Sequence, residues 1–170
     1  MPRLKACGPR DEAFGDFKIA LSSKGAHDYV AMWIDSEDPL KNVELTWAHI
    51  NQRDGWTRPA GAQDGQVLFM TTSMETWIVA DGAALEKHYG DKLQVSALPP
   101  LTDLEARSRQ DIHKQLEHAT RNCANAYAKG EPLFKILGEL SPATSEQHLP
   151  SFARMRRILN QCLELGGWRR

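Results

Sequence analysis

The stretch that most constrains the fold is an apolar run at residues 29–34, YVAMWI, which leads directly into DSEDP at residues 35–39. An apolar run of this length predicts a buried strand, and the acids after it would lie where the strand leaves the sheet. In open α/β sheets, ligands bind at the edge where parallel strands end. The sequence therefore predicts a sheet whose edge carries Asp35, Glu37 and Asp38.

The segments around this run predict a parallel sheet flanked by helices. Residues 3–7 alternate like a short strand, and residues 11–21 place their apolar side chains on one helical face. With the run at 29–34 they form a strand, helix, strand unit, which implies parallel strands with a right-handed crossover. Residues 66–70 are a third strand candidate, after a long polar connection from 51 to 65.

The last third of the chain is predicted to be helical. Short helices at 73–81 and 83–89 precede a proline-containing connector, and helices are expected over 104–124, 133–140 and 151–165. We therefore predict an α/β core over residues 1–96 and a helical C-terminal extension over 97–170, packed on the same domain. A length of 170 residues suits one such domain.

Composition excludes several classes of protein. The 21 basic and 22 acidic residues nearly balance, which is not typical of a protein that coats a polyanion. The three cysteines lie far apart without a CxxC pair, so neither a disulfide framework nor a zinc site is indicated. No apolar segment approaches the ~20 residues needed to span a bilayer. A cytoplasmic protein without a membrane segment is expected.

The acids after the predicted strand suit a hard divalent cation. Mg²⁺ or Mn²⁺ takes one or two carboxylates together with water and phosphate oxygens. Asp35 and Glu37 could reach one ion if the backbone turns there, and Asp38 could act through water. The same five residues are also typical of a surface turn, so spacing alone leaves both interpretations open.

Two further residues are candidates for catalysis. Glu75 follows the third predicted strand, so a parallel sheet would bring it to the same edge as Asp35; alternatively it is an exposed residue in a first helical turn. Lys129 stands beside Gly130 in a loop between helices, where it could contact a phosphate as a point charge. The alternative for Lys129 is a solvated loop lysine.

Four segments together resemble a known family. They are residues 30–39 with IDSEDP, residues 52–56 (QRDGW), residues 74–81 (METWIVAD), and residues 119–122 (ATRN) with 127–130 (YAKG). In this order they resemble Toprim-like domains of unknown function, which are related to nuclease modules found beside ATPases in bacterial defence operons. The segments span most of the chain, so their combination is more specific than any acid pair.

The resemblance implies a chemistry and partners. A Toprim core has one glutamate after its first strand and an acidic pair after a later strand, which jointly hold Mg²⁺ for phosphodiester chemistry. Asp35 and Glu37 would be that pair. The implied partners are an ATPase subunit of the AAA or ABC type and a nucleic acid. Open sheet edges would also allow a homo-oligomer.

One part of the family pattern is not matched. The family's first glutamate lies on a strand upstream of a Pro-Arg-Leu-like segment, and this sequence starts at that segment. Three explanations are open: the protein starts further upstream, the short form is catalytically degenerate, or Glu12 or Glu75 substitutes. The expected function is a Mg²⁺-dependent nuclease or phosphodiester-processing subunit. The alternative is a degenerate Toprim scaffold that acts as an interaction subunit.

Overall fold

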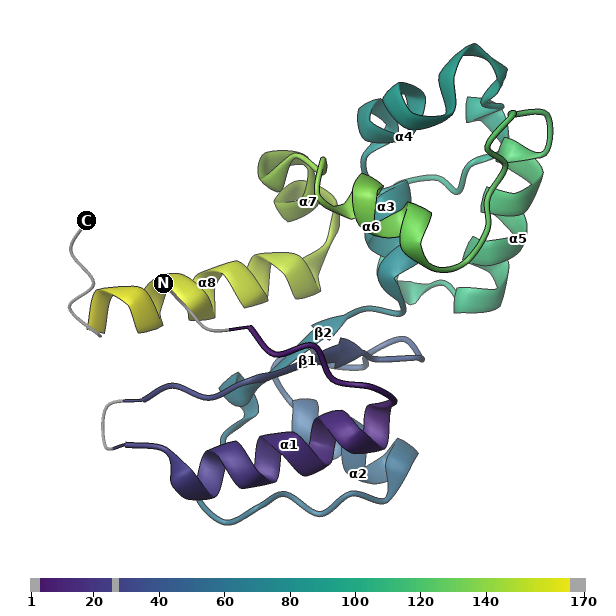
Figure 1. Ribbon diagram of the computed structural model, residues 1–170. Coiled ribbons are helices and arrows are strands. Elements are labelled where there is room, and N and C mark those ends of the chain that lie inside the picture. The colour runs from purple at the N-terminus through teal and green to yellow at the C-terminus, as the bar shows by residue number, and fades with distance from the viewer. Residues whose placement is uncertain (1–3, 26–27, 166–170) are drawn as a thin grey trace. The chain divides into compact units, whose positions relative to one another are not determined.

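The computed structural model describes residues 4–25 and 28–165. Helices predominate among these residues, and the two strands form one sheet (Figure 1). The α-helices are α1 (Arg10–Ser23), α2 (Thr46–Asp54), α3 (Met74–Val79), α4 (Gly82–Tyr89), α5 (Arg109–Thr120), α6 (Glu131–Leu137), α7 (Pro142–His148) and α8 (Pro150–Leu165). The strands are β1 (Met32–Asp35) and β2 (Val67–Met70), and short 3-10 helices cover Asp64–Gln66, Gly90–Lys92, Val95–Ala97 and Leu104–Ala106.

The chain divides into two compact units, each built from separate segments. The first unit contains the chain up to Ile34, then Asn42–Leu68, and the chain from Met155 onward. The second unit contains Asp35–Lys41 and Phe69–Arg154. These units interleave along the sequence, whereas the division expected from the sequence has a single boundary at residue 96. That division stays a prediction.

The first unit has an aromatic and aliphatic core between α1 and α2. Phe17 of α1 and both Trp47 and Ile50 of α2 are buried. The ring of Trp56, just after α2, stacks on Phe14 of α1 with 4.4 Å between the ring centroids. The connection that follows α2 is therefore anchored on α1, and Trp56 is a packing residue of this unit.

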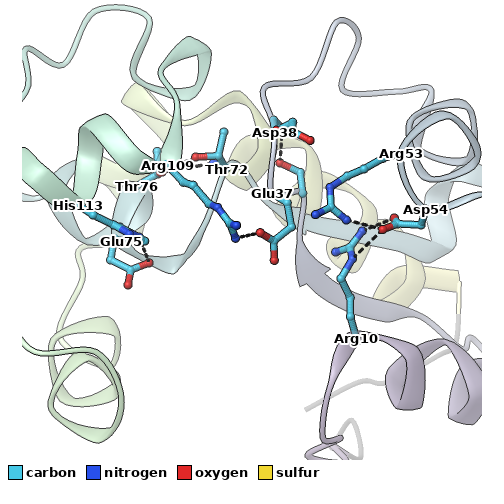
Figure 2. A network of polar contacts seen from close by, with 11 residues as sticks. Arg10, Glu37, Asp38, Arg53, Asp54, Thr72, Glu75, Thr76, Arg109 and His113 are labelled. Atoms are coloured by element: carbon cyan, nitrogen blue, oxygen red, sulfur yellow. Dashed lines mark hydrogen bonds and ion pairs between the residues drawn. The ribbon is translucent and has the colours of Figure 1, made fainter.

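An ion pair joins the same two helices. Arg10 Nη2, at the start of α1, lies 2.7 Å from Asp54 Oδ2 at the end of α2, and Arg53 is paired with the same carboxylate (Figure 2). Burial raises the pKa of Asp54, but the two guanidinium groups more than offset this effect and hold it below its ordinary value. Residues 52–56 thus have a structural role, because their side chains hold the end of α2 against α1.

The two strands form a parallel pair connected through α2. This confirms an α/β fold with a small parallel sheet and a helical C-terminal part. The prediction of a strand at residues 3–7 is wrong for residues 4–7, which are exposed and have no regular structure. Arg3 lies outside the described residues. Alternation of residue types does not produce a strand where no neighbouring face buries one side of it.

Helix α3 is central to the second unit. It packs against α4, α5 and α6 (Figure 1). Trp77 and Ile78 of α3, Leu85 of α4 and Leu116 of α5 are buried together in the core of this unit. The indole nitrogen of Trp77 donates a hydrogen bond to the hydroxyl of Ser151 at the start of α8, at 3.3 Å.

The helix expected over residues 104–124 is wrong in extent. A 3-10 turn at Leu104–Ala106 is followed by an extended Arg107, and α5 begins only at Arg109. Ser108 caps α5 by accepting a hydrogen bond from the Asp111 amide at 3.1 Å. Helix α7 was not expected either; it begins behind Ser141, whose hydroxyl accepts a hydrogen bond from the Thr144 amide.

Gly55 ends α2 in a conformation that favours glycine. Its φ is 69° and its amide donates to the Asn51 carbonyl at 3.1 Å. A Cβ at Gly55 would meet nothing within 4 Å, so Gly55→Ala should cost only the backbone term, about 1 kcal/mol in the free energy of unfolding measured with urea. Gly65→Ala is the matched control, because Gly65 has equal space without a positive φ. Equal effects of the two changes would contradict this account.

Two properties concern the part of the chain that the structure describes. None of its helices is both long and apolar enough to cross a membrane. Cys7, Cys123 and Cys162 are free thiols.

Candidate functional site

The carboxyl ends of β1 and β2 form an edge within the second unit. The amide of Ser36 donates to the Met70 carbonyl at 3.0 Å, and the amide of Glu37 donates to the Thr72 carbonyl at 2.8 Å. The pairing of the two strands therefore continues into the acidic segment. These backbone bonds fix Glu37 beside the segment that follows β2, so the acids are part of the sheet edge.

Glu37 has an unusual backbone conformation. Its φ of 69° lies in the left-handed region, which is uncommon for a residue with a side chain. Such a conformation costs on the order of 1 kcal/mol and persists where surrounding bonds impose it, often at functional sites. Its side chain forms an ion pair with Arg109 at the start of α5 (Figure 2). The side chains of Glu37 and Arg109 are 19% and 44% exposed, respectively, so the arginine is the more accessible member of the pair.

The other residues of the acidic segment have distinct environments. Ser36 is fully buried, and its hydroxyl donates to the Asp38 carbonyl at 2.7 Å, which closes a tight turn. Asp35 is partly buried at the end of β1, and Asp38 is exposed. The segment is therefore a turn, as one interpretation expected, and it places carboxylates at the sheet edge. The metal interpretation stays a prediction.

A hydroxyl-rich segment, Thr71, Thr72 and Ser73, follows β2 at the same edge. All three residues are buried. The hydroxyl of Thr72 shares a hydrogen bond of 3.2 Å with the hydroxyl of Thr76 in α3, as Figure 2 shows. This bond holds the segment against the first turn of α3, next to Glu75.

Glu75 is buried within a cluster of three titratable side chains. The hydroxyl of Tyr127 donates to Glu75 Oε1 at 2.8 Å, and His113 Nε2 of α5 lies 3.2 Å from Glu75 Oε2 (Figure 2). The side chains of His113 and Glu75 are only 15% and 8% exposed. The exposed alternative for Glu75 is therefore wrong, because α3 packs directly against α5.

The ionisation of this cluster follows from its hydrogen bonds. Burial alone would raise the pKa of Glu75, but the bond from Tyr127 and its own backbone amide, with the nearby Ser73 and His113, hold it below its ordinary value. Burial, and then the bond to Glu75, raises the pKa of Tyr127. Glu75 is therefore a carboxylate at neutral pH, and Tyr127 stays protonated as its donor.

Helix α5 supplies a basic partner to each of two acids, Glu37 and Glu75. Arg109 and His113 are four residues apart, so they lie on one face of the helix, about one turn from each other. Arg109 pairs with Glu37 and His113 with Glu75. The face of α5 therefore presents two basic side chains to two carboxylates, one in the turn after β1 and one in the first turn of α3.

Sequence reasoning named some of these residues and missed others. It identified Asp35, Glu37, Asp38 and Glu75, all of which lie in the second unit. It missed Arg109, His113 and Tyr127 as partners, although the i, i+4 spacing of Arg109 and His113 was a usable signal. Lys129 is exposed in the loop between α5 and α6, two residues after Tyr127.

The carboxylates suit Mg²⁺ only with ligands from outside the chain. Among the described residues, no group of three His, Cys, Asp or Glu side chains is arranged to hold a metal ion. Mg²⁺, however, is commonly held by one or two carboxylates together with water and phosphate oxygens. Asp35 and Glu37 are two carboxylates of the kind that such a site needs. In this structure the positive charge beside Glu37 is the guanidinium of Arg109.

The protein is thus an α/β protein with paired acids and bases where two parallel strands end. It belongs to the family described as a domain of unknown function (DUF4276), which matches residues 5–160 and so nearly the whole chain. Neither the curated proteins nor the solved structures gave a significant match. Functional inference therefore depends on the geometry of the sheet edge.

Proposed function

We propose that this protein is a Toprim-like, Mg²⁺- or Mn²⁺-dependent phosphodiester-processing subunit, with a nuclease activity as the expected chemistry. The observation that carries the proposal is that Arg109 of α5 pairs with Glu37, two residues after Asp35 where β1 ends, while His113 of the same helix pairs with Glu75. A hard cation and a phosphate together need such a mixture of carboxylates and basic side chains. The resemblance to Toprim-like domains names the same acidic pair.

Each residue has a proposed role. Asp35 and Glu37 would hold the ion, and Asp38 would reach it through water. When bound, such an ion stabilises charge on a phosphoryl oxygen and lowers the pKa of water. Glu75 would be a positioning residue, because it lies against the ring of His113, and Lys129 would contact the phosphate. Following the resemblance, an AAA- or ABC-type ATPase would be the partner and a nucleic acid the substrate.

A metal titration tests this proposal. Wild-type protein is expected to bind Mn²⁺, observed by calorimetry, and Asp35→Ala with Glu37→Ala should weaken the binding by more than about 100-fold. Loss of a group that merely orients a ligand already costs 10- to 100-fold. The matched control is Glu86→Ala with Asp91→Ala, which removes two exposed acids of the same unit. Absence of Mn²⁺ binding, or binding that survives the first pair of changes, would refute the metal-dependent function.

A second function is favoured by a specific observation. Glu37 and Glu75 each already have a basic partner from α5. This is the arrangement expected if these carboxylates stabilise the fold and do not hold an ion. We therefore keep as second candidate a Toprim scaffold that acts as an interaction subunit of the ATPase. Co-purification with the product of the adjacent gene, unaffected by Asp35→Ala and Glu37→Ala, would support it. A protein that purifies alone when both are co-expressed would count against it.

A further inference from the structure

The two basic residues on the face of α5 differ in how firmly they are held. His113 is 15% exposed and lies in the buried cluster with Glu75 and Tyr127. Arg109 is 44% exposed, and its partner Glu37 is 19% exposed. Arg109 is the exposed member of its ion pair, so its guanidinium can turn toward solvent or another acceptor without leaving a buried site, which the ring of His113 cannot do. Arg109 is therefore the basic side chain of α5 that is free to change partner.

Glu37 is also the residue for which two cations would compete. Its carboxylate is a proposed ligand for a divalent ion, and the guanidinium of Arg109 lies against that same carboxylate. A divalent ion would repel a guanidinium so close to it. Arginine has a long side chain and a planar group that binds phosphate through two parallel hydrogen bonds. A phosphate bound beside the ion is thus a suitable second partner for Arg109.

We propose that Arg109 is an exchangeable cation. Glu37 retains it while no divalent ion is bound, and it contacts a phosphodiester once Glu37 takes the ion. Substrate binding by this arginine would then depend on the metal, which prevents α5 from holding nucleic acid unproductively. The inference rests on the proposed function and deepens it, since it adds Arg109 to the proposed phosphate contacts and makes that contact depend on the metal.

The first experiment omits metal ions and measures the salt dependence of binding to fluorescein-labelled oligothymidylate and oligouridylate. Wild type and Arg109→Gln should bind equally, because Glu37 retains Arg109. Glu37→Gln releases Arg109 and should steepen the slope of log K against log salt by about 0.7, which is one additional phosphate contact on a single strand. Glu37→Gln with Arg109→Gln should return to the wild-type slope.

Several outcomes would overturn the proposal. One is a weaker affinity or shallower slope for Arg109→Gln without metal, since Arg109 would then contact phosphate regardless of Glu37. Another is a double variant that stays as steep as Glu37→Gln, because the gain would then come only from the lost negative charge. Failure of all variants to bind either strand would also overturn it. Lys114→Gln, an exposed change on the same helix, should change none of these comparisons between variants.

The second experiment separates this inference from the proposed function. Arg109→Gln should bind Mn²⁺ about fivefold more tightly than wild type, because the competing cation at Glu37 is removed, and Lys114→Gln should match wild type. If wild type binds Mn²⁺ through Asp35 and Glu37 but Arg109→Gln binds no more tightly, only the exchange is refuted. If no variant binds Mn²⁺, the proposed function fails, and the exchange fails with it as a metal-controlled step.

Discussion

Replacing Glu105 by glutamine is expected to remove a loss of stability that accompanies a rise in pH from about 4.5 to about 7. Glu105 is 8% exposed and accepts hydrogen bonds from the backbone amide and the hydroxyl of Ser151 at the start of α8. Burial raises its pKa from the model-peptide range to about 7, although both bonds from Ser151 oppose the rise. The folded protein therefore retains a proton that the unfolded chain has already released.

The sign of the effect follows from proton binding. Below about pH 4.5 the carboxyl is protonated in both states, so it causes no pH dependence there. Between about pH 4.5 and 7 the folded state binds more protons, so the free energy of unfolding falls as pH rises, by roughly 3 kcal/mol at most. Above about pH 7 the effect is constant.

Urea unfolding of wild type and Glu105→Gln at several pH values between 4 and 8 gives the difference between their free energies of unfolding at each pH. As pH rises, the variant should become more stable relative to wild type. Glu86→Gln, at an exposed position, should show no such trend. If the difference between Glu105→Gln and wild type stayed constant with pH, the buried carboxyl would not titrate as described.

Replacing Glu75 by alanine is expected to lower the free energy of unfolding by about 2 to 3 kcal/mol. The change leaves the hydroxyl of Tyr127 without its acceptor and removes the carboxylate beside the ring of His113 in a buried place, and such orphaned groups are costly. Tyr127→Phe should cost about 1 kcal/mol, because Glu75 retains its other bonds. The two changes together should cost less than their sum, with a coupling of about 1 kcal/mol.

The pH dependence of Glu75 has the opposite sign to that of Glu105. Its pKa is lowered in the folded protein, so its stabilising effect is present above the unfolded value of about 4.5 and is lost as pH falls through the folded pKa. Urea unfolding of Glu75→Gln against wild type below pH 5 measures this term. Additive effects of the Glu75 and Tyr127 changes would show that the two side chains do not interact in solution.

The sequence predicted the acidic edge because its signal is local. An apolar run followed by acids placed Asp35 and Glu37 at the end of β1, and the next apolar run placed Glu75 after β2. The partners Arg109, His113 and Tyr127 depend on how α5 and the loop after it pack against α3, which no local pattern records. The start of α5 was missed for a related reason, since a Ser108 cap interrupts an otherwise helical composition.

The path of the chain between the two compact units has a consequence for how this protein can be divided. The boundary passes through β2 between Leu68 and Phe69, and through α8 between Arg154 and Met155. Neither unit is encoded by one uninterrupted stretch of the gene. A single truncation therefore cannot yield either unit intact, and an excised acidic edge would need both Asp35–Lys41 and Phe69–Arg154.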